Sequence, residues 1–225
     1  MKLHLQEVIK RIKSTDSVIP AKRKGFKQGY SFSKESFEKQ LLIWDYIWKN
    51  SDTLRAKLHA FFFLESCLAK KDLHEIIWET SAAWQEQVDG WALCDALAKI
   101  NSKVLVTYPT EVYSTLSKWN KDENLWKRRQ SVVSLLYYSR TKKVYLPFKK
   151  ITALVEPLFN DKEYYVQKGV GWTMREMYNV YSAETMWFLQ KHIKRISAIA
   201  FTIAIEKLDE NEKGTIKGMR KSKIR

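Results

Sequence analysis

The chain has few of the residues that interrupt or cross-link a polypeptide. Only seven glycines, four prolines and two cysteines occur in 225 residues. Short alternating apolar runs bounded by turn residues are almost absent, which argues against a β-rich fold. Cys67 and Cys94 have no metal-binding spacing and form no disulfide framework, so we expect a reducing compartment.

Long apolar runs and the common catalytic motifs are also missing. The apolar run 60–64 is far too short to cross a bilayer, and the N-terminal segment is too charged for a signal peptide. We therefore expect no membrane contact and a cytoplasmic, nucleoid-associated protein of a bacterial-type cell. No His-Glu-x-x-His, Cys-x-x-Cys, Gly-x-Ser-x-Gly or phosphate-loop pattern occurs. We expect neither a metal ion nor a cofactor.

Positive charge and aromatic rings are what the chain has in excess. The formal net charge is +15, and the sequence pI is about 9.6. Aromatic residues make up 13% of the chain and include nine tryptophans. Cations that hold phosphates, together with rings that contact bases or sugars, favour a nucleic-acid partner. The alternative for any one tryptophan is that it fills a helical core.

Apolar residues recur with the helical period along nearly the whole chain. The pattern predicts helices over residues 3–14, 34–49, 52–69, 72–87, 90–100, 109–118, 122–139, 147–158, 162–181, 183–192 and 194–208. Many helices with mostly short loops predict an all-α fold, a curved solenoid of HEAT-like antiparallel helical pairs. We expect one domain over residues 1–212, acting as a monomer, whose concave face could hold a duplex.

Two basic segments lie outside the predicted helices. Residues 15–33 form the clearest loop. We predict that this loop contacts DNA through four cations and an interleaved ring: Lys22, Arg23, Lys24, Lys27 and Tyr30. Residues 213–225 contain six basic residues and no acidic one, which predicts a mobile tail that binds DNA. The alternative is a solvated terminus with little function.

Residues 88–95 place a tryptophan and a carboxylate together, away from the core. Asp89 can cap a helix that begins here, and an apolar stripe follows at Leu93, Leu97 and Ile100. At about 100° per residue, Trp91 lies roughly 200° from Leu93 and one turn before Asp95. An exposed tryptophan beside an aspartate indicates a functional surface.

Trp172 is displaced from its core stripe in the same way. The apolar stripe of this helix is formed by Val166, Val170, Met174 and Met177. Trp172 lies roughly 200° around the helix from Val170 and therefore outside the stripe. Gly169 and Gly171 precede it and reduce helix stability. The close approach of another helix, or of a sugar–phosphate backbone, would explain these glycines.

Arg129 lies in the middle of an apolar helical sector. Its neighbours three and four residues away are apolar on both sides: Leu125, Trp126, Val132 and Val133. A charge there is costly unless it is paired or lines a groove. The two compatible interpretations are a buried arginine bonded to a carboxylate, such as Asp95, and a residue that binds a ligand in a groove.

Three motifs of this chain resemble the DNA alkylation repair glycosylases of the AlkD type, which are built from HEAT-like repeats. The motifs are Trp91-Ala-Leu-Cys-Asp95, Leu125-Trp-Lys-Arg-Arg129 and Val166-Gln-Lys-Gly-Val-Gly-Trp172-Thr-Met-Arg-Glu176, in family order. The resemblance covers roughly residues 40–210. It implies that Asp95 is catalytic, that Trp91 and Trp172 cradle the substrate and that Arg129 lines the groove. It also implies hydrolysis of the N-glycosidic bond of N3- and N7-alkylated purines in double-stranded DNA, without flipping the lesion.

The residue types fit the implied chemistry. An alkylated purine is cationic and leaves well, so a carboxylate that stabilises the developing sugar cation and positions water is sufficient. Aromatic faces can contact the sugar and the cationic nucleotide. Further DNA contacts are expected from Arg128, Lys168, Arg175, Arg220 and Lys221. Two alternatives remain open: a non-catalytic HEAT-repeat protein that binds DNA or DNA structures, and a protein-interaction solenoid.

Overall fold

A computed structural model describes residues 1–13, 19–137, 139–141 and 143–224. Every regular element within these ranges is a helix and none is a strand, so the all-α prediction is confirmed. The chain divides into two compact units, Met1–Ile100 and Asn101–Arg225, and each is described by itself. The boundary falls inside helix α6 (Trp91–Val104). The single domain predicted over residues 1–212 stays a prediction.

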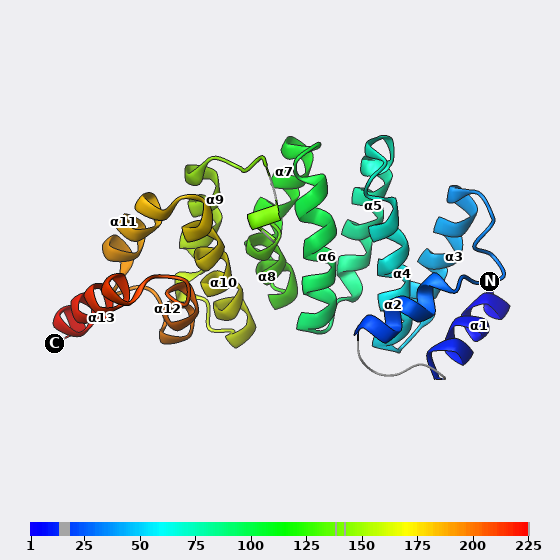
Figure 1. Cartoon of the computed structure of the whole chain (residues 1–225), viewed down its shortest axis with the longest axis horizontal. Helices are drawn as coiled ribbons and strands as arrows, with labels where there is room; N and C mark the ends of the chain where they lie inside the picture. Colours follow the sequence, from blue (N-terminus) through cyan, green and yellow to red (C-terminus); the bar gives the residue numbers. More distant parts are fainter. Residues whose placement is uncertain (14–18, 138, 142, 225) are drawn as a thin grey trace. The chain divides into compact units, whose positions relative to one another are not determined.

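The first unit is organised around α4 (Leu54–Cys67). The other elements are α1 (Lys2–Lys13), α2 (Ile19–Lys27), α3 (Phe37–Asn50), η1 (Lys71–Leu73), α5 (His74–Trp84), η2 (Gln85–Gln87) and the first part of α6. Helix α4 packs against α1, α2 and α3 (Figure 1). Residues 58–64 of α4 are all buried. Because a helix that is buried all round belongs to a core, α4 forms the centre of this unit.

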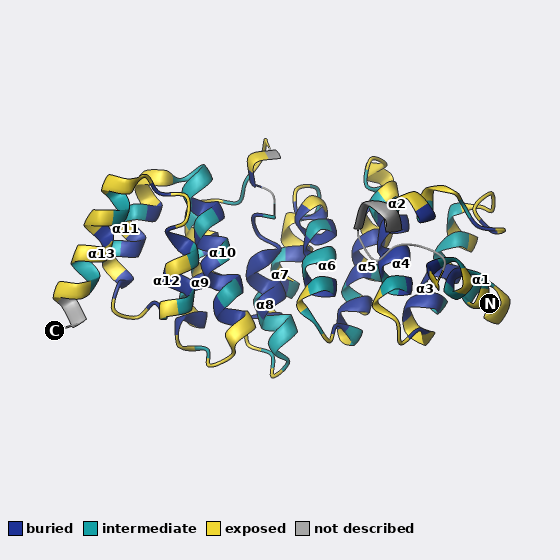
Figure 2. Cartoon of the chain, turned by 60° about the horizontal axis from the view of Figure 1, so that its bottom comes forward, coloured by how far each residue is buried: buried dark blue, intermediate teal, exposed yellow. Residues whose placement is uncertain are grey.

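Several tryptophans of the first unit are core residues. The rings of Trp48 and Trp84 stack with their centroids 4.4 Å apart and their planes at 7°. The indole of Trp48 donates to the carbonyl oxygen of Trp84 at 3.2 Å, and that of Trp84 donates to Asp45 at 3.0 Å. Figure 2 shows the buried residues along α3, α4 and α5 in dark blue. For these tryptophans the core-filling interpretation is correct.

The second unit is organised around α10 (Tyr164–Val180). The other elements are α7 (Pro109–Trp119), α8 (Leu125–Val133), η3 (Ser139–Thr141), α9 (Phe148–Val155), η4 (Glu156–Asn160), α11 (Ser182–His192), α12 (Ala198–Ala204) and α13 (Glu210–Ile224). Helix α10 packs against α8, α9, α11 and α12. Its predicted stripe of Val166, Val170, Met174 and Met177 is fully buried.

The two glycines of α10 allow close packing against different neighbours. A Cβ atom at Gly171 would lie 2.6 Å from the carbonyl oxygen of Ala200 in α12. A Cβ atom at Gly169 would lie 3.2 Å from Cγ of Arg129 in α8. The approach of another helix therefore accounts for Gly171, and the passage of an arginine side chain accounts for Gly169.

Three sequence-based expectations about elements need correction. Residues 15–33 are not a simple loop, because α2 occupies Ile19–Lys27. The helix predicted over 122–139 ends at Val133. Residues 213–224 lie in α13 and do not form a mobile tail. Tertiary contacts explain this helix, because Ile216 is fully buried and Arg220 donates to the carbonyl oxygens of Ile193 and Ile196.

Candidate active site

The start of α6 displays Trp91 and Asp95 on its outward side. Trp91 is the first residue of the helix, and 55% of it is exposed. Asp95 follows one turn later and is half-buried. The predicted stripe of Leu93, Leu97 and Ile100 is buried. The prediction that this tryptophan points away from the core is therefore confirmed.

Helix α6 is tied to α4 and α2 through the carboxylate of Glu65. Lys99 of α6 and Arg23 of α2 both form ion pairs with Glu65 of α4. Lys99 lies one turn beyond Asp95. The ion pairs therefore fix the helix that carries Trp91 and Asp95 to the core helix of the first unit.

Arg129 of α8 is buried, as its position in the apolar sector predicts. Only 7% of the residue is exposed, and Nη1 donates to the carbonyl oxygen of Tyr165 at 2.8 Å. This bond spans from α8 to α10, and the side chain passes over Gly169 on the way. Asp95, the carboxylate proposed as its partner, belongs to the first unit, so that pairing stays a prediction.

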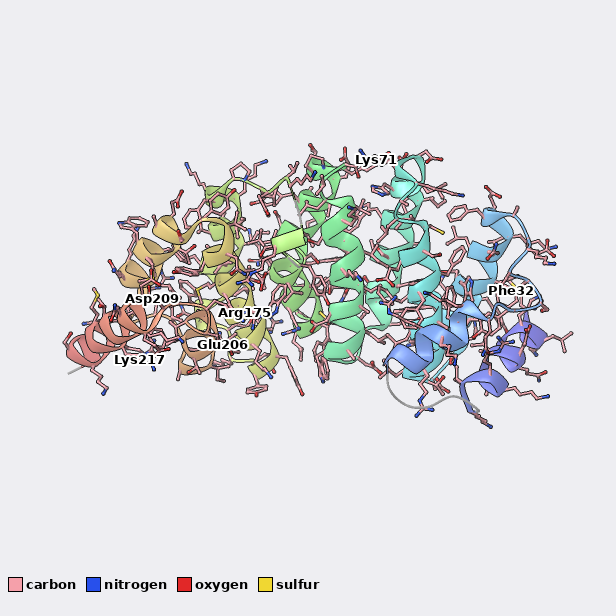
Figure 3. The ribbon with its side chains drawn as sticks, in the orientation of Figure 1. Phe32, Lys71, Arg175, Glu206, Asp209 and Lys217 are labelled. Carbon is pink, nitrogen blue, oxygen red and sulfur yellow. The ribbon has the colours of Figure 1, made fainter. Side chains whose placement is uncertain are left out.

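Trp172 of α10 lies half-buried between a ring and a guanidinium. Its ring centroid is 5.4 Å from that of Tyr137, with the planes at 38°. The guanidinium of Arg175 lies 5.7 Å from the Trp172 centroid. Arg175 also donates to Glu206 at 2.7 Å, and both residues are labelled in Figure 3. The tryptophan is therefore held at an accessible position beside a paired cation.

A second carboxylate near Trp172 has a structural role. Glu176 is buried, and its Oε2 accepts hydrogen bonds from the backbone nitrogen and hydroxyl of Ser139 at 3.3 Å and 2.6 Å. Asn179 donates to the same oxygen at 3.3 Å. These bonds attach η3 to α10. The carboxylate is engaged with the fold and is a poor candidate for chemistry on a ligand.

An aromatic cluster that helical spacing did not indicate lies at the start of α10. Tyr164 is 52% exposed, and its ring centroid lies 5.2 Å from that of Tyr165. Tyr165 in turn lies 5.1 Å from Trp126 of α8, and Lys168 lies over Tyr164 at 5.3 Å. The available signal was the pair of tyrosines directly before the stripe that begins at Val166.

Three residues predicted to contact DNA make hydrogen bonds within their own unit, and their contact with DNA stays a prediction. Tyr30 is buried, packs against Phe32 and Trp44 and hydrogen-bonds His59. Burial is the largest cause that raises the pKa of Tyr30 above its ordinary value.

The other two are arginines whose donors are used within the second unit. Arg128 donates to Asp161 at 2.6 Å and to the carbonyl oxygens of Asp122 and Glu123. Arg220 donates to two carbonyl oxygens between α11 and α12, and its guanidinium lies 4.4 Å from the centroid of Phe201. The helical spacing around these residues does not reveal such partners, because they lie up to 33 residues away in sequence.

The remaining basic residues predicted to contact DNA have mixed surroundings. Lys24, Lys27 and Lys221 are exposed, and Lys168 and Arg175 are half-buried beside rings. Arg23 is paired with Glu65. The side chain of Lys22 lies outside the described residues. Among described residues, no three metal-binding side chains gather into a site, and no helix there has the length and apolar character to cross a membrane.

The chain is similar to one family of known proteins. The model of the DNA alkylation repair enzyme family matches residues 18–208. No curated protein matches the chain significantly. Two solved structures share its fold. One is described as AlkD2 from Streptococcus mutans, with TM-score 0.63, 15% identity and coverage of 92% of this chain and 99% of that one.

The other is described as a predicted DNA alkylation repair enzyme from Enterococcus faecalis. It superposes with TM-score 0.70 at 13% identity and covers 93% of this chain and 96% of that one. At such identities the two structures show the fold alone. The family match extends over most of the chain and includes all three motifs described above. The chain therefore belongs to the DNA alkylation repair enzyme family.

Proposed function

We propose that this protein is a monofunctional DNA glycosylase that releases cationic N3- and N7-alkylated purines from duplex DNA without flipping the lesion. The observation that carries the proposal is the outward side of α6. It presents a largely exposed indole one turn from a half-buried carboxylate. An aromatic face and a carboxylate both attract positive charge, and positive charge develops on the deoxyribose as the glycosidic bond breaks.

The reaction is a hydrolysis that needs no strong acid. The bond from C1′ to the purine nitrogen breaks, and the purine leaves with the bonding electrons, which neutralise its positive charge. Asp95 stabilises the oxocarbenium-like sugar and positions a water molecule. The water oxygen bonds to C1′ and releases its proton to solvent, which leaves an abasic site.

Trp91, Trp172 and Arg129 complete the substrate site in this proposal. The two indoles contact the deoxyribose and the cationic nucleotide, and Arg129 lines the groove. We further propose that the helices form a curved solenoid of HEAT-like antiparallel pairs. The family match and the off-core position of each tryptophan support this arrangement.

The basic surface supplies the sequence-independent part of DNA binding. Exposed lysines such as Lys24, Lys27 and Lys221 neutralise phosphates and release counterions. Half-buried Lys168 and Arg175 contact the backbone nearer the lesion. We propose that the protein acts in the cytoplasm as a monomer, with DNA as its partner.

The direct test is single-turnover release of base from a duplex that contains 7-methylguanine. We expect the protein to release free 7-methylguanine faster than the same duplex loses it in buffer. A duplex of the same sequence with guanine serves as the control and should release nothing. Tight binding to the alkylated duplex with no accelerated release would contradict the proposal and favour a non-catalytic DNA-binding protein.

A further inference from the structure

A cluster of three ionic side chains lies in the first unit, outside the residues that the proposed reaction uses. Arg23 of α2 and Lys99 of α6 both pair with Glu65 of α4, and Arg23 Nη2 donates to Glu65 Oε1 at 3.1 Å. The guanidinium of Arg23 lies over the Phe62 ring, 4.5 Å from its centroid. We call Arg23, Glu65 and Lys99 the Glu65 cluster.

Glu65 is a shielded anion between two cations. Its side chain is only 14% exposed, whereas those of Arg23 and Lys99 are 40% and 37% exposed. Burial by itself would raise the pKa of Glu65, but hydrogen bonds and charges of Arg23 and Lys99 hold that pKa below its ordinary value. The carboxylate is therefore ionised at neutral pH and carries the one negative charge of the cluster.

Lys99 connects this cluster to the candidate active site. It lies one turn beyond Asp95 and two turns beyond Trp91, so the three side chains lie along the same side of α6. Side chains four residues apart are neighbours on a helix, and an ammonium group there attracts the Asp95 carboxylate. Glu65 draws the same ammonium group toward α4.

We propose that Glu65 is a positioning residue for the reaction at Asp95. Its carboxylate holds Lys99 toward α4 and offsets the lysine charge, which preserves the negative field that Asp95 presents to the sugar. The inference rests on the proposed function, because it concerns the residue that stabilises the sugar cation there. Glu65 itself touches neither the DNA nor the reacting atoms and acts through Lys99.

A purely structural role for Glu65 makes a different prediction. If Glu65 only tied α2, α4 and α6 together, its loss would weaken the fold, and removing Lys99 as well would not restore the reaction. If Glu65 controls the Lys99 charge, removing that charge should cancel the effect of losing Glu65. A double-mutant cycle therefore separates the two roles.

The experiment compares Glu65→Gln, Lys99→Met, the double variant and the charge-conserving Glu65→Asp. We expect Glu65→Gln to slow single-turnover release of 7-methylguanine about tenfold, less than the 10²–10³ cost of removing a direct stabiliser. Affinity for undamaged duplex should stay equal or rise, because a negative charge is lost. Adding Lys99→Met should restore the rate to within about twofold of wild type, and Glu65→Asp should retain most of it.

A second readout does not depend on excision. Each variant is titrated with a duplex in which a pyrrolidine ring, a cationic analogue of the reacting sugar, replaces one nucleotide. Relative to undamaged duplex, we expect Glu65→Gln to bind this duplex several-fold more weakly, Lys99→Met to bind it more tightly, and the double variant to return toward the wild-type ratio. If Glu65→Gln fails to fold, the ratio for Lys99→Met decides, and an unchanged ratio there overturns the inference.

The remaining outcomes distinguish this inference from the proposed function. A normal rate and an unchanged ratio of the two affinities in Glu65→Gln would overturn the positioning role and leave the glycosylase proposal intact. A slow Glu65→Gln variant that Lys99→Met does not rescue would show a structural role alone. Absence of base release by the wild-type protein would overturn the proposed function, and the two affinities would still decide whether Glu65 acts on the field of Asp95.

Discussion

Gly169 on α10 lies directly under the side chain of Arg129 on α8. A Cβ atom at position 169 would be 3.2 Å from Cγ and 3.4 Å from Nη1 of Arg129. The arginine crosses this point to donate to the carbonyl oxygen of Tyr165 at 2.8 Å. The missing Cβ therefore sets the path of the buried arginine. Helical spacing indicates each of the two residues by itself but not their contact.

Gly169→Ala should slow base release while it changes stability little. The added methyl group displaces Arg129 by a few tenths of an ångström, and alanine stabilises the helix by about 1 kcal/mol relative to glycine. We expect a severalfold lower single-turnover rate, below the roughly 100-fold cost of a 1 Å misplacement. Thermal unfolding at matched conditions provides the control. A normal rate with normal stability would show that the path of Arg129 does not matter for the reaction.

Gly171→Ala should destabilise the protein clearly. A Cβ atom there would lie 2.6 Å from the backbone oxygen and 2.9 Å from Cα of Ala200, so a helix must move. Overpacking of this kind costs about 3 kcal/mol, against a helix gain of about 1 kcal/mol. We expect the melting temperature to fall by about 4–8 °C. Equal melting temperatures for Gly171→Ala and Gly169→Ala would contradict the close approach of α12 to α10.

Asp95→Asn should abolish most of the acceleration and leave DNA binding intact. Asparagine has nearly the same shape but cannot offer a negative charge to the sugar cation, which costs about 10²–10³ in rate. Affinity for undamaged duplex should hold or rise slightly. Asp89→Asn, an exposed carboxylate just before α6, is the matched control and should excise at the wild-type rate. Equal rates for Asp95→Asn and wild type would eliminate the proposed mechanism.

Lys24→Gln with Lys27→Gln should weaken duplex binding in a salt-dependent way. Each phosphate contact contributes about −0.9 to the slope of log affinity against log salt concentration. We expect the slope to become shallower by up to about 1.8 when both contacts are lost. Lys70→Gln with Lys71→Gln, two exposed lysines at the turn η1, controls for net charge. The same slope change in both double variants would show that only net charge matters.

Removal of residues 213–225 should destabilise the second unit, because α13 is packed and not free. Ile216→Ala removes a fully buried side chain and should cost about 2–4 kcal/mol of unfolding free energy.

Lys221→Gln on the exposed side of the same helix should leave stability unchanged and weaken duplex binding. Chemical denaturation and a salt titration measure the two effects. An Ile216→Ala variant as stable as wild type would contradict the packed helix.

Part of the site follows from helical periodicity, which is a local property of the sequence. The angle between a residue and its neighbouring apolar stripe depends only on spacing along the helix. Spacing therefore correctly placed Trp91 and Trp172 off the core and Arg129 within it. The same reasoning predicted the buried stripes of α6 and α10 and the absence of strands among the described residues.

The sequence alone determined which side of each helix is apolar, since that depends on spacing within a single segment. Only the tertiary structure decided how the charged residues are used, because their partners come from distant segments. Arg23 meets Glu65 across 42 residues and Arg128 meets Asp161 across 33. Helix α2 contains Gly25 in its interior, and tertiary contacts of Phe26 with Trp44 and Phe62 hold this helix in place. Helical spacing relates only residues of the same helix. It therefore does not predict contacts between residues of different helices, which form when the helices pack together.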